Sequence, residues 1–212
     1  YKWYGSDVEV CIGDSYQYLL KDFIEKYKED KDSTIVVTTT KAKTDMLNFD
    51  IQNKLISEGL LDNKQPYIVK PSSTKGKPYK MYVGDNIMVL KNNQTSREFN
   101  DKKLDDYLTE DEYGNVVYMI ATEKMPIFNG EIYTIKDVYE EGFVLLTDGK
   151  NDIIVEVNLL ECCLAYASNC HKLQGSGMNN VYIYHTSDWV DNNMMLSAQW
   201  LYTAYTRAKK HL

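Results

Sequence analysis

Thr34-Ile35-Val36-Val37-Thr38 is a nearly continuous apolar stretch in which every side chain is β-branched. β-Branched side chains favour strands, and a strand without an alternating polar face is typical of a sheet buried on both sides. We therefore expect residues 34–38 to form a buried strand, and the rest of the fold is predicted outward from it.

Helical spacing on both sides of this strand predicts an α/β fold. Upstream, a capping-box pattern begins at Asp14, with Gln17 three residues later, and predicts a helix over about 15–29. Downstream, Asp45 is the expected cap of a second helix, and Gly59 its expected end. Helix, strand and helix in this order indicate α/β layering. The apolar residues at helical spacing are Leu19, Leu20, Phe23, Ile24 and Tyr27, then Leu47, Ile51, Leu55 and Ile56.

The sequence changes character after a linker rich in Pro, Ser, Gly and Lys at residues 70–78. Short strand patterns separated by turns follow, which indicates a small β-barrel. The polar stretch 97–112 is expected to be a loop or a surface hairpin. The expected strands are Tyr82–Leu90, Val116–Ala121, Ile132–Val138, Phe143–Leu146 and Ile153–Val157, with turns at Gly84-Asp85, Tyr113-Gly114-Asn115, Asn129-Gly130 and Asp148-Gly149.

The α/β pattern returns at Cys162. Residues 162–167 are expected to form one buried strand, 171–174 a short helical turn, and 181–184 another strand. Ser197 is the expected cap of a final helix. The residues of that helix spaced for burial are Trp200, Leu201, Ala204, Tyr205 and Ala208.

Net charge and cysteine content limit the classes of protein to which this sequence can belong. The net charge is -7, so binding to nucleic acid would need a local basic patch. The basic runs at 41–43, 70–80 and 207–210 are candidates, although each taken alone is better explained as a solvated surface run. The sequence has no apolar run of about 18 residues, so no membrane span is expected. Its 4 Cys lack the spacing of a disulfide framework or a zinc site, which favours reduced thiols, no metal and a cytoplasmic protein.

The most specific segment is Leu201-Tyr202-Thr203-Ala204-Tyr205-Thr206-Arg207-Ala208-Lys209-Lys210. It resembles motif VI of superfamily 1 helicases, L-x-T-A-x-T-R-A-K. A guanidinium is always charged, and its fork of donors matches phosphate oxygens. The resemblance implies that Arg207 is a catalytic arginine finger that contacts the γ-phosphate, and we expect it on a helix, aimed outward. An ordinary surface arginine near a helix end is the alternative.

A second segment, Ala165-Tyr166-Ala167-Ser168-Asn169-Cys170-His171-Lys172-Leu173-Gln174-Gly175-Ser176, resembles motif V of the RecD/TraA-like branch, A-Y-A-x-T-x-H-K-x-Q-G-S-E. Two positions depart from the pattern: Asn169 replaces a threonine, and Gly177 replaces a glutamate expected near the nucleotide ribose. The resemblance implies two sets of contacts. Ser168, Asn169, His171 and Lys172 would face DNA phosphates, and Gln174 and Gly175 would line the nucleotide site.

Two weaker resemblances complete the set. The strand 34–38 and the following helix resemble motif IV, which implies that Thr39, Thr40 and Lys41 lie near DNA. A plain strand-to-helix loop explains them equally well. The segments Gly84–Met88 and Asn129–Ile135 resemble G-D-x-V-M and N-G-E-x-G-x-I of an SH3-like barrel in RecD-like helicases, with Tyr133 in place of the second glycine.

Together these segments resemble the C-terminal, second RecA-like (P-loop NTPase-type) domain of a superfamily 1B DNA helicase of the RecD/TraA-like, exodeoxyribonuclease V alpha-like branch. The resemblance implies a discontinuous RecA-like domain at 1–78 and 159–212, interrupted by an SH3-like barrel at 79–158. It also implies ATP-dependent movement on single-stranded DNA, with 5′ to 3′ polarity. Nuclease or recombination subunits are the partners it suggests, in DNA repair or recombination.

The phosphate-binding pattern G-x-x-x-x-G-K-[ST] is missing, as is a Walker B pair. The chain starts at Tyr1 without a Met or a signal-peptide pattern, which suggests a piece of a longer protein. We expect ATP and Mg²⁺ to be held by a preceding motor domain, and the piece alone to bind neither and to be inactive. Two alternatives stay open: a nucleic-acid or protein binding module, and a degenerate motor scaffold, which Gly177 favours.

Overall fold

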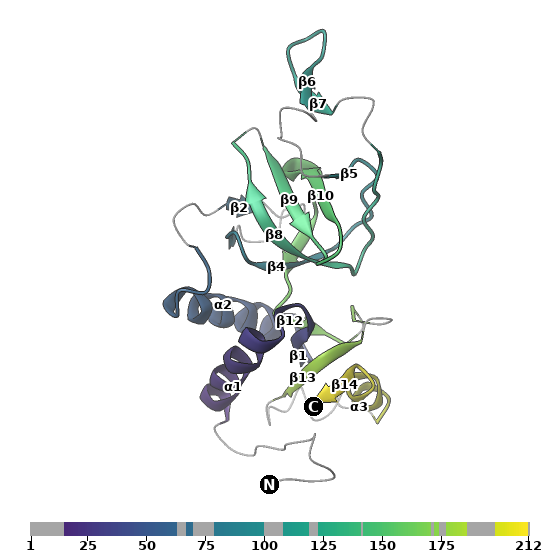
Figure 1. Cartoon of the computed structure of the whole chain (residues 1–212). Helices are drawn as coiled ribbons and strands as arrows, with labels where there is room; N and C mark the ends of the chain where they lie inside the picture. Colours follow the sequence, from purple (N-terminus) through teal and green to yellow (C-terminus); the bar gives the residue numbers. More distant parts are fainter. Residues whose placement is uncertain are drawn as a thin grey trace. The chain divides into compact units, whose positions relative to one another are not determined.

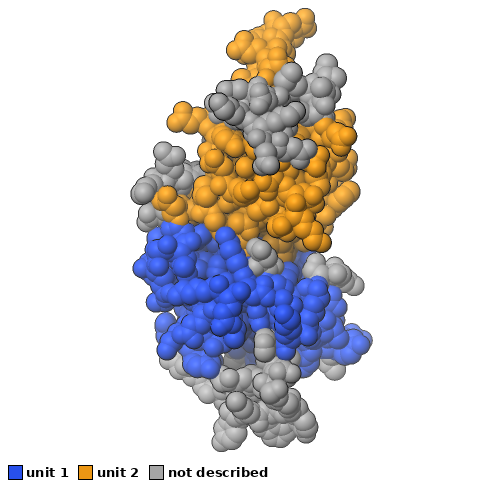
Figure 2. All heavy atoms as spheres, viewed as in Figure 1, with its two compact units in different colours: residues 1–61, 164–212 blue, residues 62–163 orange. Residues whose placement is uncertain are grey.

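The computed structural model describes residues 15–62, 67–69, 79–99, 108–118, 123–140, 142–170, 172–173, 177–185 and 198–211. The chain divides into two compact units (Figure 2). Unit 1 comprises Tyr1–Leu61 and Leu164–Leu212, and unit 2 comprises Asp62–Cys163. The division falls at 61/62 and 163/164 rather than at the expected 78/79 and 158/159. One reason is that β2 (Tyr67–Val69) pairs with β3 (Tyr79–Met81).

Unit 1 is built on a parallel sheet with the strand order β12-β1-β13-β14 (Figure 1). Its strands are β1 (Thr34–Thr38), β12 (Ala167–Asn169), β13 (Met178–Tyr184) and β14 (Ala208–His211). All three pairings are parallel. Every residue of β1 is buried, as its nearly continuous apolar sequence predicts.

Two long helices lie next to each other beside this sheet (Figure 1). The first, α1 (Tyr16–Glu29), buries the five residues predicted for it, begins after Ser15, and leads through a 3₁₀ turn, η1 (Lys31–Ser33), into β1. The expected cap Asp14 lies outside the described residues. The second, α2 (Lys41–Ser57), starts earlier than expected, because the side chain of Thr40, not Asp45, accepts the Lys43 N–H at 3.4 Å.

Gly59 ends α2 as predicted. Its φ of 70° is left-handed, a conformation that glycine adopts without steric cost. Its N–H donates to the Ile56 carbonyl, and the Leu60 N–H donates to Leu55, which satisfies carbonyls at the helix end.

Two predictions for the C-terminal part are wrong. Residues 162–167 form two strands, β11 (Cys162–Leu164) and β12, which belong to different sheets. The final helix, α3 (Ala198–Tyr205), stops before Arg207, and residues from Ala208 form β14 instead. Ala208 and the lysines after it suit a helix locally, but pairing with β13 overrides that preference. In α3, Trp200 and Ala204 are buried as predicted, whereas Tyr205 is half exposed.

Nearly all of a six-stranded sheet, in the order β11-β4-β8-β9-β10-β5, lies in unit 2. Figure 1 labels its strands β4, β8, β9, β10 and β5. Neighbours from β4 to β5 pair antiparallel. The glycines of all four predicted turns have positive φ. The remaining elements are β4 (Asn86–Val89), β5 (Arg97–Glu98), β8 (Ile132–Val138), β9 (Phe143–Thr147), β10 (Asp152–Glu156) and the 3₁₀ turn η3 (Val157–Leu159).

One predicted barrel strand lies elsewhere. Val116–Tyr118 forms β7, which pairs with β6 (Leu108–Glu110) in a separate hairpin, and β5 occupies the sheet edge next to β10. The polar stretch 97–112 therefore contributes both an edge strand and half of a hairpin. In the described part of the chain, no helix is long and apolar enough to cross a membrane.

Candidate functional site

The carboxyl ends of three strands meet at one edge of the unit 1 sheet. Thr38 at the end of β1 is in register with Asn169 on one side and with Tyr184 on the other. The segments that follow β1 and β12 therefore start side by side. Loops at the carboxyl edge of a parallel sheet are where ligands usually bind in α/β proteins.

The turn after β1 is held by hydroxyl groups. The Thr38 and Thr44 hydroxyls lie 2.6 Å apart, and Thr44 also donates to the Thr40 carbonyl at 3.0 Å. Thr39 is only 5% exposed, so its side chain points into the protein. Thr40 is half-buried and Lys41 is exposed at the first turn of α2. A cation at this position is available to an anion near the edge.

The turn after β12 has a similar division between buried and exposed groups. Ser168 is 3% exposed, and its hydroxyl donates to the Asn169 carbonyl at 3.4 Å. The Asn169 side chain accepts the Lys172 N–H at 3.1 Å, which fixes the turn, and Lys172 itself is exposed. Burial thus corrects the expectation that the side chains of Thr39 and Ser168 face DNA. Four of the residues expected to contact DNA are exposed or partly exposed at this edge: Thr40, Lys41, Asn169 and Lys172.

Arg207 lies between α3 and β14 rather than on a helix, which corrects the expected position. Its main chain leads into β14, and its carbonyl accepts the Met178 N–H at 2.9 Å. Its half-buried guanidinium folds back over the end of α3, where Nε donates to the Thr203 carbonyl at 3.1 Å and Nη2 to the Thr206 hydroxyl at 3.2 Å. Nη1 donates to the Leu173 carbonyl at 3.3 Å. The two most specific sequence segments are therefore in direct contact.

Cys170 shows how close the guanidinium lies to the crossover between β12 and β13. This thiol is fully buried, and burial raises its pKa, while the positive charge of Arg207 acts in the opposite direction. His171, Gln174 and Gly175 lie outside the described residues, so their predicted roles stay predictions. Within the described ranges, no group of three or more His, Cys, Asp or Glu side chains could hold a metal ion.

Sequence reasoning included Asn48 in the motif IV resemblance but did not predict that this residue holds β12 in place. Asn48 on α2 is 5% exposed, and its amide makes two hydrogen bonds to the main chain of Ala167, one residue before Ser168. A polar residue at an apolar position of the helix was the available signal, because a buried amide needs partners. The partner itself lies too far along the chain to be read from the pattern.

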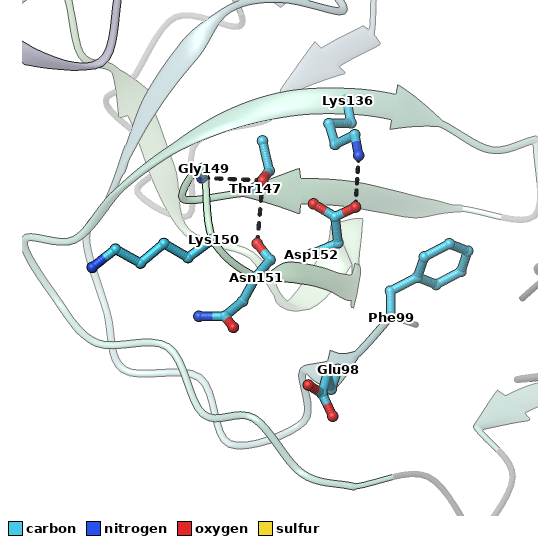
Figure 3. Close-up of a pocket in the computed structure, with 8 residues that line it drawn as sticks. All are labelled: Glu98, Phe99, Lys136, Thr147, Gly149, Lys150, Asn151 and Asp152. Atoms are coloured by element: carbon cyan, nitrogen blue, oxygen red, sulfur yellow. Dashed lines mark hydrogen bonds and ion pairs between the residues drawn. The ribbon is translucent and has the colours of Figure 1, made fainter. Parts of the chain in front are cut away.

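Unit 2 contains a separate open hollow of about 430 Å³ (Figure 3). Lys136 reaches across to Asp152, and their ion pair measures 2.6 Å. Two carboxylates in the lining, Glu98 and Asp152, balance Lys136 and Lys150, so the local charge does not favour phosphate. The lining residues are Glu98, Phe99, Lys136, Thr147, Gly149, Lys150, Asn151 and Asp152.

Comparison with known proteins connects unit 1 with one family. Residues 164–212 match the family model of the UvrD-like helicase C-terminal domain. The matched segment contains β12, β13, α3 and β14, and with them Lys172 and Arg207. No curated protein matches the chain.

Several solved structures are similar to the chain at low sequence identity. Pif1 helicase from Candida albicans is 16% identical with a TM-score of 0.47, over 93% of this chain and 48% of that protein. Bacteroides Pif1 bound to ssDNA is 15% identical with a TM-score of 0.45, over 93% and 47%. Bacteroides Pif1 with ADP-AlF3 and ssDNA is 14% identical with a TM-score of 0.46, over 93% and 43%. The chain therefore spans less than half the length of these proteins.

Proposed function

We propose that this chain is the second motor domain of an ATP-dependent superfamily 1 DNA helicase or translocase that moves 5′ to 3′ on single-stranded DNA. The observation that carries the proposal is the contact between the Arg207 guanidinium and the Leu173 carbonyl, next to the exposed Lys172. The match of residues 164–212 to the UvrD-like helicase C-terminal domain supports it. We further propose a RecD-like branch, an SH3-like barrel in unit 2 and a cytoplasmic location.

The donors of Arg207 fit a phosphate ligand. A guanidinium has five N–H groups. Hydrogen bonds to described residues use three of them, which leaves one N–H on each terminal nitrogen. Charged donors of this kind bind phosphate oxygens. No carboxylate among the described residues pairs with this side chain.

In the proposed motor, hydrolysis of ATP bound with Mg²⁺ transfers the γ-phosphoryl group to water, releases ADP and drives movement. Arg207 orients toward the γ-phosphate and stabilises the charge that develops there. Its contacts with Thr203 and Leu173 hold the fork before the ligand arrives, so little conformational freedom is lost on binding. The sequence lacks a phosphate-binding loop, so we propose that a preceding domain of the same protein supplies one.

Neighbouring residues of the crossover face the two proposed ligands. Lys172 is exposed beside Asn169, where the DNA backbone would bind, whereas Leu173 is fully buried and contacts Arg207 through its carbonyl. A shift of this crossover on DNA would therefore move a hydrogen-bond acceptor of the arginine. We propose that this link couples the position of DNA to hydrolysis.

The test is the single-stranded-DNA-stimulated ATPase activity of the full-length protein that contains this chain. Arg207→Lys keeps the charge but loses the fork, and we expect kcat to fall by about 10³-fold. Arg97→Lys is the matched control, because that guanidinium also donates to main-chain carbonyls, of Thr95 and Ser96, but in unit 2. We expect it to keep kcat within about twofold.

Two results would overturn the proposal. The first is full DNA-stimulated turnover by the Arg207→Lys protein. The second is a wild-type protein that binds single-stranded DNA without hydrolysing ATP, which would favour a binding module instead.

A further inference from the structure

Gly177 and Lys209 form a closely fitted pair at the start of β13. A Cβ at position 177 would come within 2.5 Å of Lys209 Cε and 3.4 Å of its Nζ. The three nearest atoms to such a Cβ all belong to the Lys209 side chain. The lysine therefore occupies the space that a side chain at 177 would need. The backbone of Gly177 is not in the left-handed region, so room for Lys209 is the constraint at this position.

A register irregularity in β14 accompanies this arrangement. Met178 pairs with Ala208, but Asn180 pairs with His211, so β14 contains one extra residue at Lys209–Lys210. Bulges of this kind redirect a side chain at the edge of a sheet. The order β12-β1-β13-β14 makes β14 an edge strand among the described strands. The lysine is thus directed along the start of β13.

Two cationic residues, Arg207 and Lys209, lie at the same end of the sheet. Because Met178 pairs with Ala208, Gly177 lies beside Arg207 at the same end of the sheet. The guanidinium is half-buried against Leu173, while Lys209 is exposed two residues further on. Among the described residues, no carboxylate pairs with Lys209 either. An unneutralised pair of cations favours an anion with several charged oxygens.

We infer that Lys209, held over Gly177, is a second phosphate contact of the nucleotide and sets its affinity, beside Arg207. The inference rests on the proposed function. It adds a residue that binds the nucleotide but takes no part in its hydrolysis. DNA also carries phosphate, but the exposed residues assigned to it follow Thr38 and Asn169 at the carboxyl edge. Gly177 and Arg207 directly precede β13 and β14, at the opposite edge of the sheet. A lysine binds phosphate as a point charge, so its effect falls on affinity.

Equilibrium binding of a non-hydrolysable ATP analogue to the full-length protein tests this inference without turnover. Lys209→Gln is expected to raise the Kd about five- to tenfold and the KM for ATP similarly, with kcat changed less than about twofold. Gly177→Ala should raise the Kd and the KM in the same way, because the added methyl group displaces only the flexible end of the Lys209 side chain. The double variant should bind no more weakly than Lys209→Gln alone, because the two substitutions act on one contact.

Lys210→Gln is the matched control, since it removes the adjacent exposed charge, and its Kd should stay within about twofold of wild type. An unchanged nucleotide Kd in Lys209→Gln overturns the inference and leaves the proposed function standing. A weaker affinity for a single-stranded oligonucleotide alone also overturns it, since Lys209 would then contact DNA. A wild-type protein that binds no nucleotide overturns the proposed function and this inference together.

Discussion

The side-chain amide of Asn48 and the main chain of Ala167, 119 residues apart, are joined by two hydrogen bonds. The Asn48 Nδ2 donates to the Ala167 carbonyl at 3.1 Å, and the Ala167 N–H donates to the Asn48 Oδ1 at 2.8 Å. β12 is an edge strand of the described sheet, so these main-chain groups have no neighbouring strand on that side. A helix side chain thus takes the place of a strand and holds the start of the proposed DNA-binding turn.

Asn48→Ala is expected to lower the free energy of unfolding by about 2–3 kcal/mol, because it leaves a buried N–H and a buried carbonyl without partners. Asn53→Ala, an exposed asparagine on the same helix, is the control and should change stability by about 0.5 kcal/mol or less. Urea unfolding of the chain measures both. Equal losses of unfolding free energy in the two variants would show that the hydrogen bonds between Asn48 and Ala167 do not stabilise β12.

The hydrogen bond between Tyr182 and Asp22 predicts a pH dependence. The Tyr182 hydroxyl donates to Asp22 Oδ2 at 2.7 Å and joins β13 to α1. Burial, and then this hydrogen bond, raise the pKa of Tyr182 above its ordinary value of 10.0. A raised folded-state pKa stabilises the fold below pH 10, and that stability is lost as pH rises further.

Unfolding measured between about pH 9 and 11 should therefore show a smaller loss of stability with pH in Tyr182→Phe than in the wild type. At neutral pH the same substitution should cost about 1 kcal/mol for the lost hydrogen bond. Tyr202→Phe, at a residue that is 70% exposed, should leave both quantities unchanged. Identical slopes for wild type and Tyr182→Phe would contradict the assignment.

The reactivity of two cysteines should differ sharply. Cys170 is fully buried and burial raises the pKa of its thiol, whereas Cys163 is partly exposed. Alkylation requires access and the thiolate. At pH 8 we expect iodoacetamide to label Cys163 at least about tenfold faster than Cys170, and both equally in urea. Mass spectrometry of peptides locates the label, and fast labelling of Cys170 in the folded chain would contradict its buried position beside Arg207.

The two exposed lysines at the carboxyl edge should control the salt dependence of DNA binding. Each phosphate contact to single-stranded DNA contributes about 0.7 to the slope of log Kd against log salt. Lys41→Gln and Lys172→Gln in the full-length protein should each reduce that slope by about this amount. Lys21→Gln removes an exposed charge on α1 and serves as control. A slope that changes equally in all three variants would indicate nonspecific charge rather than a site.

Local patterns predicted most of the elements, because their causes are local. The apolar periodicity of α1, the β-branched run of β1 and the glycine turns of unit 2 each depend on neighbouring residues. The wrong predictions concern segments whose secondary structure depends on pairing with residues far away in the sequence. Residues 162–167 look like one apolar strand, but β11 pairs with β4 and β12 with β1, so the strand is divided between two sheets.

The sequence by itself determined the layered character of unit 1, the turn positions of unit 2 and the residue types that point to phosphate chemistry. Only the tertiary structure decided which of those residues reach the surface. Thr39 and Ser168 are buried. Arg207 lies after the helix rather than on it, because the residues that follow it pair with β13 as a strand. The contact between Arg207 and Leu173, and the fit of Lys209 over Gly177, had no sequence signal. Such contacts depend on strand register and on the free space between side chains far apart in the chain.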